Sequence, residues 1–290
     1  MKKHYLYAAI SILGWSTVAT IVKLSLGAMS SIQVLCISAL FASLFLCAVS
    51  CITGSIKKLK SYKPRDYLIS ALVGLPGNFL YYIFYYSGTS FMLASQAFIV
   101  NYLWPIMCVI FACIILKEKL TPVKLLALGL SFVGVIVVIG RDILFFEWNT
   151  LIGAALCAIG AVCYGIFTAL TQKTSYEKPL TMMISFFASF LLSAIICLVR
   201  GEFPSLGGLQ WIGIAWNGIV SIGIASTLWQ LALSGADTAK ISNLAYITPF
   251  LSMIWTWLIL GEEISLWSLV GLGIILLGIF IQLGFSHSKS

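Results

Sequence analysis

Long apolar runs are the feature that most constrains this chain. A helix needs about 20 predominantly apolar residues to cross a bilayer, and the 290-residue sequence holds ten such runs. They cover approximately 5–26, 31–53, 66–87, 91–116, 122–140, 149–171, 179–199, 209–234, 238–260 and 265–285. Each run is continuous, whereas a membrane β-strand alternates apolar and polar positions over about ten residues. The sequence therefore predicts an all-α polytopic membrane protein with ten transmembrane helices.

The composition leaves no room for a sizeable soluble domain. Apolar residues make up 61% of the chain and charged residues only 9%, whereas soluble domains carry about 25% charged residues. The net charge of +8 does not indicate nucleic-acid binding, because the basic residues are few and stand in short clusters between apolar runs. We expect the lipid bilayer, and no nucleic acid, as the partner of most of the surface.

The positions of lysine and arginine predict the orientation in the membrane. Ten helices place both termini on one side, and that side would carry 14 of the 17 basic residues. The other side would carry only Lys23, Arg141 and Arg200. Because cytoplasmic loops are enriched in Lys and Arg, we predict a multi-pass protein of the cell (inner or plasma) membrane with both termini cytoplasmic.

The two halves of the sequence match each other at a shift of 144 residues. The matching pairs are Tyr102 and Tyr246, Pro105 and Pro249, Leu116 and Leu260, Glu118 and Glu262, Gly129 and Gly273, Gly134 and Gly278, and Gly140 and Gly284. The second and seventh runs show no such match. Each half holds five helices, an odd number, so the second half must enter the membrane upside down. We predict two inverted five-helix repeats, residues 1–145 and 146–290.

The residues able to carry chemistry favour a transporter over an enzyme. All eight cysteines fall inside predicted helices, no CxxC motif occurs, and His4 and His287 lie near the ends. We therefore expect no metal and no cofactor. The spans hold no clustered nucleophile or acid–base set, and P-loop and dinucleotide motifs are absent. Inverted repeats are instead typical of secondary transporters, which bind a small molecule near the membrane midplane.

Several motifs resemble the drug/metabolite transporter superfamily, specifically its EamA-type ten-helix members. They are Gly14-Trp15-Ser16 followed by Lys23, the span endings Leu116-Lys117-Glu118-Lys119-Leu120 and Leu260-Gly261-Glu262-Glu263-Ile264, and the spaced glycines of the fifth and tenth runs. The stretch Asn101-Tyr102-Leu103-Trp104-Pro105 is similar to the aromatic amino-acid exporter (YddG) branch. This resemblance covers nearly the whole chain and implies inverted five-helix repeats, a central cavity and efflux of amino acids or related metabolites. Tyr164-Gly165 departs from the Trp-Gly pair more typical of the family.

Polar and aromatic residues inside the apolar runs are the candidates for substrate binding, because a polar group in hydrocarbon needs a partner or a wet cavity. The predicted substrate-binding residues are Trp15, Asn78, Tyr81, Tyr82, Tyr85, Asn101, Tyr102, Trp104, Tyr164, Trp229 and Tyr246. Pro105 frees a backbone carbonyl near Asn101, and Pro249 is its counterpart in the second half. The alternative for the deep aromatic residues is packing in the protein core.

Lys23 is the basic residue predicted to lie at hydrocarbon depth on the sparsely charged side. Its side chain either reaches back to the membrane surface or serves as a counter-charge for a substrate carboxylate. No Asp or Glu lies in the middle of a predicted span, which disfavours proton coupling through a membrane-buried acid. Lys23, Pro105 and Pro249 are therefore the candidates for charge or gating roles.

Small residues recur at every fourth position of the sixth run and predict a tight helix–helix contact, within the chain or across a homodimer. They are Gly153, Cys157, Ala161, Gly165 and Ala169.

The predicted function is an alternating-access secondary transporter that exports or facilitates movement of amino acids (aromatic or other neutral amphipathic ones) or related small metabolites. An aromatic-walled cavity suits a flat ring or a cation through stacking and cation–π contact. A carrier of another solute, such as a nucleoside, a vitamin or a cationic drug, and a channel-like facilitator are the alternatives.

Overall fold

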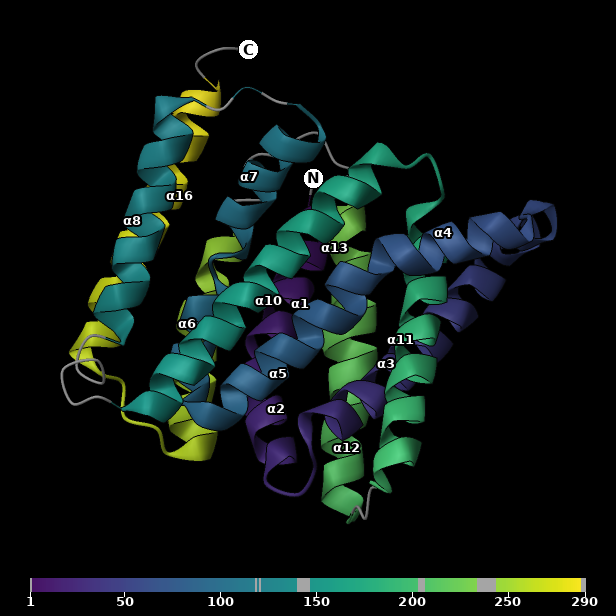
Figure 1. Cartoon of the computed structure of the whole chain (residues 1–290), viewed down its shortest axis with the longest axis horizontal. Helices are drawn as coiled ribbons and strands as arrows, with labels where there is room; N and C mark the ends of the chain where they lie inside the picture. The colour runs from purple at the N-terminus through teal and green to yellow at the C-terminus, as the bar shows by residue number, and fades with distance from the viewer. Residues whose placement is uncertain are drawn as a thin grey trace.

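The computed structural model describes residues 2–117, 119, 121–139, 147–202, 207–233 and 244–287. Within these residues every regular element is a helix and no strand occurs (Figure 1). The all-helical fold predicted from the continuous apolar runs is confirmed. The predicted repeat boundary between residues 145 and 146 lies outside the described residues.

The first half supplies five helical spans. Their elements are α1 (Lys2–Ser16) and α2 (Val18–Leu26); α3 (Ser31–Ile52); α4 (Pro64–Gly74), η2 (Leu75–Leu80) and α5 (Tyr81–Phe91); α6 (Ala94–Asn101) and α7 (Trp104–Ile115); and α8 (Pro122–Val138). A 3-10 helix, η1 (Ser55–Ser61), joins α3 to α4.

The second half follows the same order. Its elements are α10 (Trp148–Lys173); α11 (Lys178–Arg200); α12 (Gly208–Trp216), η3 (Asn217–Ile224) and α13 (Ala225–Leu233); η4 (Ala245–Ile247), α15 (Thr248–Trp255) and η5 (Thr256–Leu260); and α16 (Leu266–His287). Of the helices in the described residues, seven are long and apolar enough to cross a membrane, and three more are shorter apolar helices. The described part of the chain thus places a helical segment in each of the ten predicted spans, although residues 238–243 of the ninth lie outside it.

Corresponding spans of the two halves are interrupted in the same way. The third and eighth spans each contain a π-helical stretch near their middle, η2 and η3. The fourth and ninth spans each break and restart at a proline, since Pro105 is the second residue of α7 and Pro249 the second of α15. Proline fits the first turn of a helix because its missing N–H has no intrahelical partner there. These shared interruptions are the structural counterpart of the inverted sequence repeat.

Glycines at helix contacts allow the backbones of neighbouring helices to approach closely. Helices α8 and α16 lie side by side at one edge of the molecule (Figure 1). A Cβ atom added to Gly134 of α8 would lie 2.7 Å from the carbonyl oxygen of Gly271 of α16, and the reverse distance is 2.6 Å. Such close approach between backbones is characteristic of small residues in membrane helices.

The small residues of the sixth span make their close contacts within the chain. A Cβ atom on Gly153 of α10 would lie 2.9 Å from the carbonyl oxygen of Gly88 in α5. One on Gly165 would lie 2.6 Å from the carbonyl carbon of Met107 in α7. The tight contact predicted for this span is therefore made to α5 and α7, and the homodimer stays a prediction.

We expect Gly271→Ala to lower the thermal-unfolding midpoint of the detergent-solubilised protein. The added methyl group must push α16 away from α8, and overpacking of this kind costs about 1–3 kcal/mol. Gly273→Ala is the matched control, because a Cβ atom there meets nothing within 4 Å and alanine is the better helix former. Equal midpoints for the two variants would contradict the close contact.

Candidate functional site: an aromatic cavity between the two halves

A cavity of about 310 Å³ lies between helices of both halves. Of the residues that the structure describes, 21 line this cavity, and ten of them are aromatic. The lining comprises Trp15, Val18, Tyr81, Tyr82, Tyr85, Phe98, Asn101, Tyr102, Trp104, Tyr164, Phe167, Thr168, Thr171, Gln172, Lys178, Met182, Ser221, Ser226, Trp229, Ala245 and Thr248. The volume is near the lower end of the range for small-molecule sites, about 300–1,000 Å³, so the cavity suits a small solute.

Nine of the eleven residues predicted to bind substrate line this single cavity. The other two lie elsewhere. Asn78 is buried and donates through Nδ2 to the hydroxyl of Ser185 on α11, 2.5 Å away. Tyr246 packs edge-on against Phe280 of α16, with ring centroids 4.9 Å apart. Substrate contact by the nine lining residues stays a prediction.

The aromatic wall is built from rings that contact one another across helices. Tyr164 of α10 lies with its ring centroid 5.0 Å from that of Tyr81 on α5 and 5.3 Å from that of Trp104 on α7. Trp15 of α1 and Trp229 of α13 have ring centroids 5.2 Å apart and bring the first and eighth spans together. Spacings of about 4.5–7 Å are those at which aromatic pairs attract. The wall is therefore a connected set of rings able to stack on a flat ligand.

The break between α6 and α7 places polar groups beside these rings. Asn101, the last residue of α6, donates through Nδ2 to the hydroxyl of Tyr81, 2.9 Å away, and its Oδ1 has no hydrogen-bond partner in the described residues. Pro105 has no N–H to donate to the Asn101 carbonyl four residues earlier. The break thus concentrates hydrogen-bond acceptors at the cavity. The hydroxyl of Tyr102 donates to the carbonyl of Ala245, 2.6 Å away, and links the fourth span to the ninth.

Lys23 does not line the cavity but binds the end of another helix. Its Nζ donates to the carbonyl oxygens of Thr89 and Met92, at 2.8 and 2.6 Å, where α5 ends. A cation at a helix C-terminus is favourable because the free carbonyls carry partial negative charge. Lys23 therefore fastens the first span to the third, an arrangement distinct from both predicted roles.

Glu262 makes the complementary contact at the adjacent helix start. Its carboxylate accepts hydrogen bonds from the backbone N–H groups of Ala94 and Ser95, at 2.7 and 3.0 Å, and from the Ser95 hydroxyl at 2.7 Å. These are groups of the first turn of α6, which an anion stabilises. A residue of the second half thereby caps a helix of the first. Its sequence counterpart, Glu118, lies outside the described residues.

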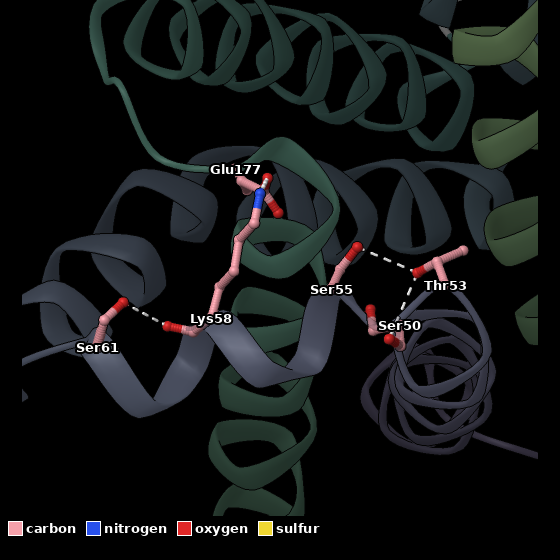
Figure 2. Close-up of polar contacts among 6 residues, drawn as sticks. All are labelled: Ser50, Thr53, Ser55, Lys58, Ser61 and Glu177. Atoms are coloured by element: carbon pink, nitrogen blue, oxygen red, sulfur yellow. Dashed lines mark hydrogen bonds and ion pairs between the residues drawn. The ribbon is translucent and has the colours of Figure 1, made fainter.

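At the other end of the bundle, polar contacts join η1 and the first turn of α4 to the segment between α10 and α11. Lys58 of η1 forms an ion pair with Glu177, as Figure 2 shows. The hydroxyl of Tyr176 donates to Asp66 Oδ1 at 2.9 Å, and this hydrogen bond raises the pKa of Tyr176. The side chains of Lys58 and Glu177 are 60% and 36% exposed, so solvent screens their pair and it contributes about 0–1 kcal/mol.

Two buried Asn–Ser hydrogen bonds could not be predicted from the sequence. Asn217 of η3 donates through Nδ2 to Ser38 of α3 at 3.0 Å and to the Tyr86 hydroxyl at 2.8 Å. Asn78 of η2 and Ser185 of α11 form the equivalent pair, so each pair joins one half of the chain to the other. The serines were uninformative in the sequence because a serine in a helix can bond its own backbone. The two pairs relate the second and seventh spans, where the sequences themselves do not match.

Comparison with known proteins agrees with this architecture. The sequence model of the EamA-like transporter family matches residues 2–140 and 151–284. An aromatic amino acid exporter YddG from Ancylobacter novellus is 25% identical over 185 residues, which are 62% of this chain and 64% of the exporter's length. An uncharacterized transporter from Archaeoglobus fulgidus is 26% identical over 288 residues, 96% of this chain and 98% of the relative.

A solved crystal structure superimposes with a TM-score of 0.69 at 21% identity, covering 97% of this chain and 96% of the other. At that identity the likeness concerns the fold. The family match, in contrast, spans both halves of the chain. The chain therefore belongs to the EamA-like transporter family of the drug/metabolite transporter superfamily, and it is a multi-pass membrane transporter built as ten helices in two inverted repeats.

Proposed function

We propose that this chain is an alternating-access secondary transporter of the cell (inner or plasma) membrane, with both termini cytoplasmic, for aromatic or other neutral amphipathic amino acids or related small metabolites. The observation that carries the proposal is the cavity of about 310 Å³ walled by ten aromatic side chains. Rings such as Tyr81, Trp104 and Tyr164 offer stacking faces to a flat ligand. The similarity to a relative named as an aromatic amino acid exporter supports the same class.

The hydrogen bonding around the cavity suits a zwitterion better than a cationic drug. Acceptors at the α6–α7 break, such as the backbone carbonyl of Asn101 that Pro105 cannot bond, can receive an ammonium group. No Asp or Glu is among the lining residues that the structure describes, so a permanent cation would find no counter-ion there. A neutral amphipathic molecule places its ring against the aromatic wall and its polar groups at the break.

Alternating access is supported by the unequal ends of the cavity. Toward one end, the lining includes the exposed residues Gln172 and Lys178, where α10 ends and α11 begins. Toward the other end, Lys23 joins the first span to the end of α5, and Glu262 of the second half caps the start of α6. With the orientation predicted from the basic residues, the cavity faces the cytoplasm. Inverted repeats provide an equivalent packing that opens the opposite end.

Counterflow in proteoliposomes tests this function. Vesicles loaded with unlabelled L-tryptophan and diluted into labelled L-tryptophan should accumulate label transiently, and the initial rate should saturate with external concentration. Protein-free vesicles are the control for passive leakage. Flux that neither saturates nor shows counterflow would indicate a channel-like pore. Counterflow with uridine or a cationic dye, but with no amino acid, would overturn the proposed substrate class.

A further inference from the structure

Lys178 is the single ionised side chain among the cavity-lining residues that the structure describes. It is exposed at the start of α11, opposite Thr171 and Gln172 near the end of α10, which line the same part of the cavity. All other polar lining residues are neutral hydroxyls or amides. A lone cation at the mouth of a low-dielectric cavity attracts anionic groups of entering molecules.

The charge of Lys178 is not neutralised by the acidic residues nearby. Glu177, its neighbour in the sequence, is ion-paired with Lys58 of η1, and Figure 2 shows the Lys58 side chain reaching it. Asp66 accepts the hydroxyl of Tyr176 and the backbone N–H of Lys63. Within the described residues Lys178 makes no ion pair or hydrogen bond. Glu177 is thus paired with Lys58, which lies outside the cavity, and not with Lys178, which lines it.

We propose that Lys178 is a specificity-determining residue that selects solutes bearing a carboxylate as they enter the cavity. This inference rests on the proposed function, because it assumes that the cavity takes up amphipathic solutes from that end. The ammonium group pairs with the carboxylate while the ring of the solute passes toward the aromatic wall. Lys178 acts on binding and on discrimination between solutes, not on the conformational change.

Competition with three indole compounds tests the role of Lys178. L-Tryptophan counterflow is measured in the presence of one of two competitors. Indole-3-propionate has a carboxylate and no amine, and tryptamine has an amine and no carboxylate. The wild-type protein should be inhibited more strongly by indole-3-propionate. In Lys178→Gln this preference should fall about two- to fivefold, the effect expected from the upper half of the range for solvent-exposed ion pairs, and the apparent KM for L-tryptophan should rise by a similar factor. Because salt screens exposed charges, the difference from wild type should shrink at 0.5 M salt.

Matched variants separate charge from structure. Lys178→Arg should keep the wild-type preference, because the charge remains. Lys173, the last residue of α10, is also exposed but does not line the cavity. Lys173→Gln should therefore also behave as wild type. The inference would be overturned if Lys178→Gln kept the preference for indole-3-propionate over tryptamine, or if Lys173→Gln lost as much of it. Either result would leave the proposed function intact. Absence of wild-type counterflow with L-tryptophan and with every other neutral amino acid would instead refute the proposed function, and this inference with it.

Discussion

Trp104→Ala is expected to lower the rate of L-tryptophan counterflow at subsaturating concentration at least about tenfold. Trp104 begins α7, lines the cavity, and lies with its ring centroid 5.3 Å from that of Tyr164 and 6.1 Å from that of Tyr102. Its removal takes away a stacking surface and leaves part of the wall empty. Burying an aromatic side chain contributes about 1.5–3 kcal/mol, and a loss of about 1.4 kcal/mol is tenfold in affinity.

A tryptophan outside the cavity provides the control for this experiment. Trp148 begins α10 with 68% of its surface exposed, in the position of an interfacial aromatic anchor, and Trp148→Ala should transport normally. Tyr82→Ala should reduce counterflow in the same direction as Trp104→Ala, because Tyr82 also lines the cavity. Thermal-unfolding curves check that both cavity variants are folded. If the folded variants transport as well as Trp148→Ala, the site is assigned wrongly.

Glu262→Gln is expected to loosen the end of the bundle where the second half caps α6. The wild-type carboxylate accepts three hydrogen bonds through its two oxygens, from Ala94 and Ser95. A glutamine amide keeps one accepting oxygen and loses the charge that the start of a helix favours. Loss of a helix cap costs about 0.5–2 kcal/mol, which shifts an opening equilibrium by roughly two- to thirtyfold.

Hydrogen–deuterium exchange measures this loosening directly. Amides of the first turns of α6 should exchange faster in Glu262→Gln than in wild type, because exchange follows local opening. Lys23→Met should have a similar effect on the last turn of α5, whose carbonyls lose their cation. The control is Glu263→Gln, since Glu263 is exposed and adjacent in the sequence. Equal exchange in Glu262→Gln and Glu263→Gln would show that the cap does not hold this end closed.

The candidate site shows where reasoning from helical spacing succeeds and where it ends. Tyr82 and Tyr85 are three residues apart, a spacing that places them on one face of a helix, and both line the cavity together with Tyr81. Asn78 shares that spacing but meets Ser185 of α11 instead. Asn78 lies inside a π-helical stretch of the third span, Leu75–Leu80, whose period differs from the 3.6 residues per turn that an argument from helical spacing assumes. The stretch contains Pro76 and Gly77, a pair that signals an interrupted helix but does not specify a π-helical one.

Lys23 shows a different limit. Its depth in the first span was readable from residue count, but its partners are the carbonyls of Thr89 and Met92, more than 60 residues away in the chain. The capping of α6 by Glu262 is equally remote in sequence, at 168 residues from Ala94. Both contacts depend on the tertiary packing of the helices, so no short segment of the sequence could predict them.

The sequence by itself determined that this chain crosses a membrane as ten helices in two inverted halves. That follows because apolar length decides which segments enter a bilayer, and because an odd number of helices per repeat reverses the second copy. The tertiary structure alone decided which of the aromatic residues share one cavity and which polar groups join the halves. Contacts between membrane helices depend on rotation, tilt and close backbone approach, and those are set by neighbouring helices rather than by the helix's own sequence.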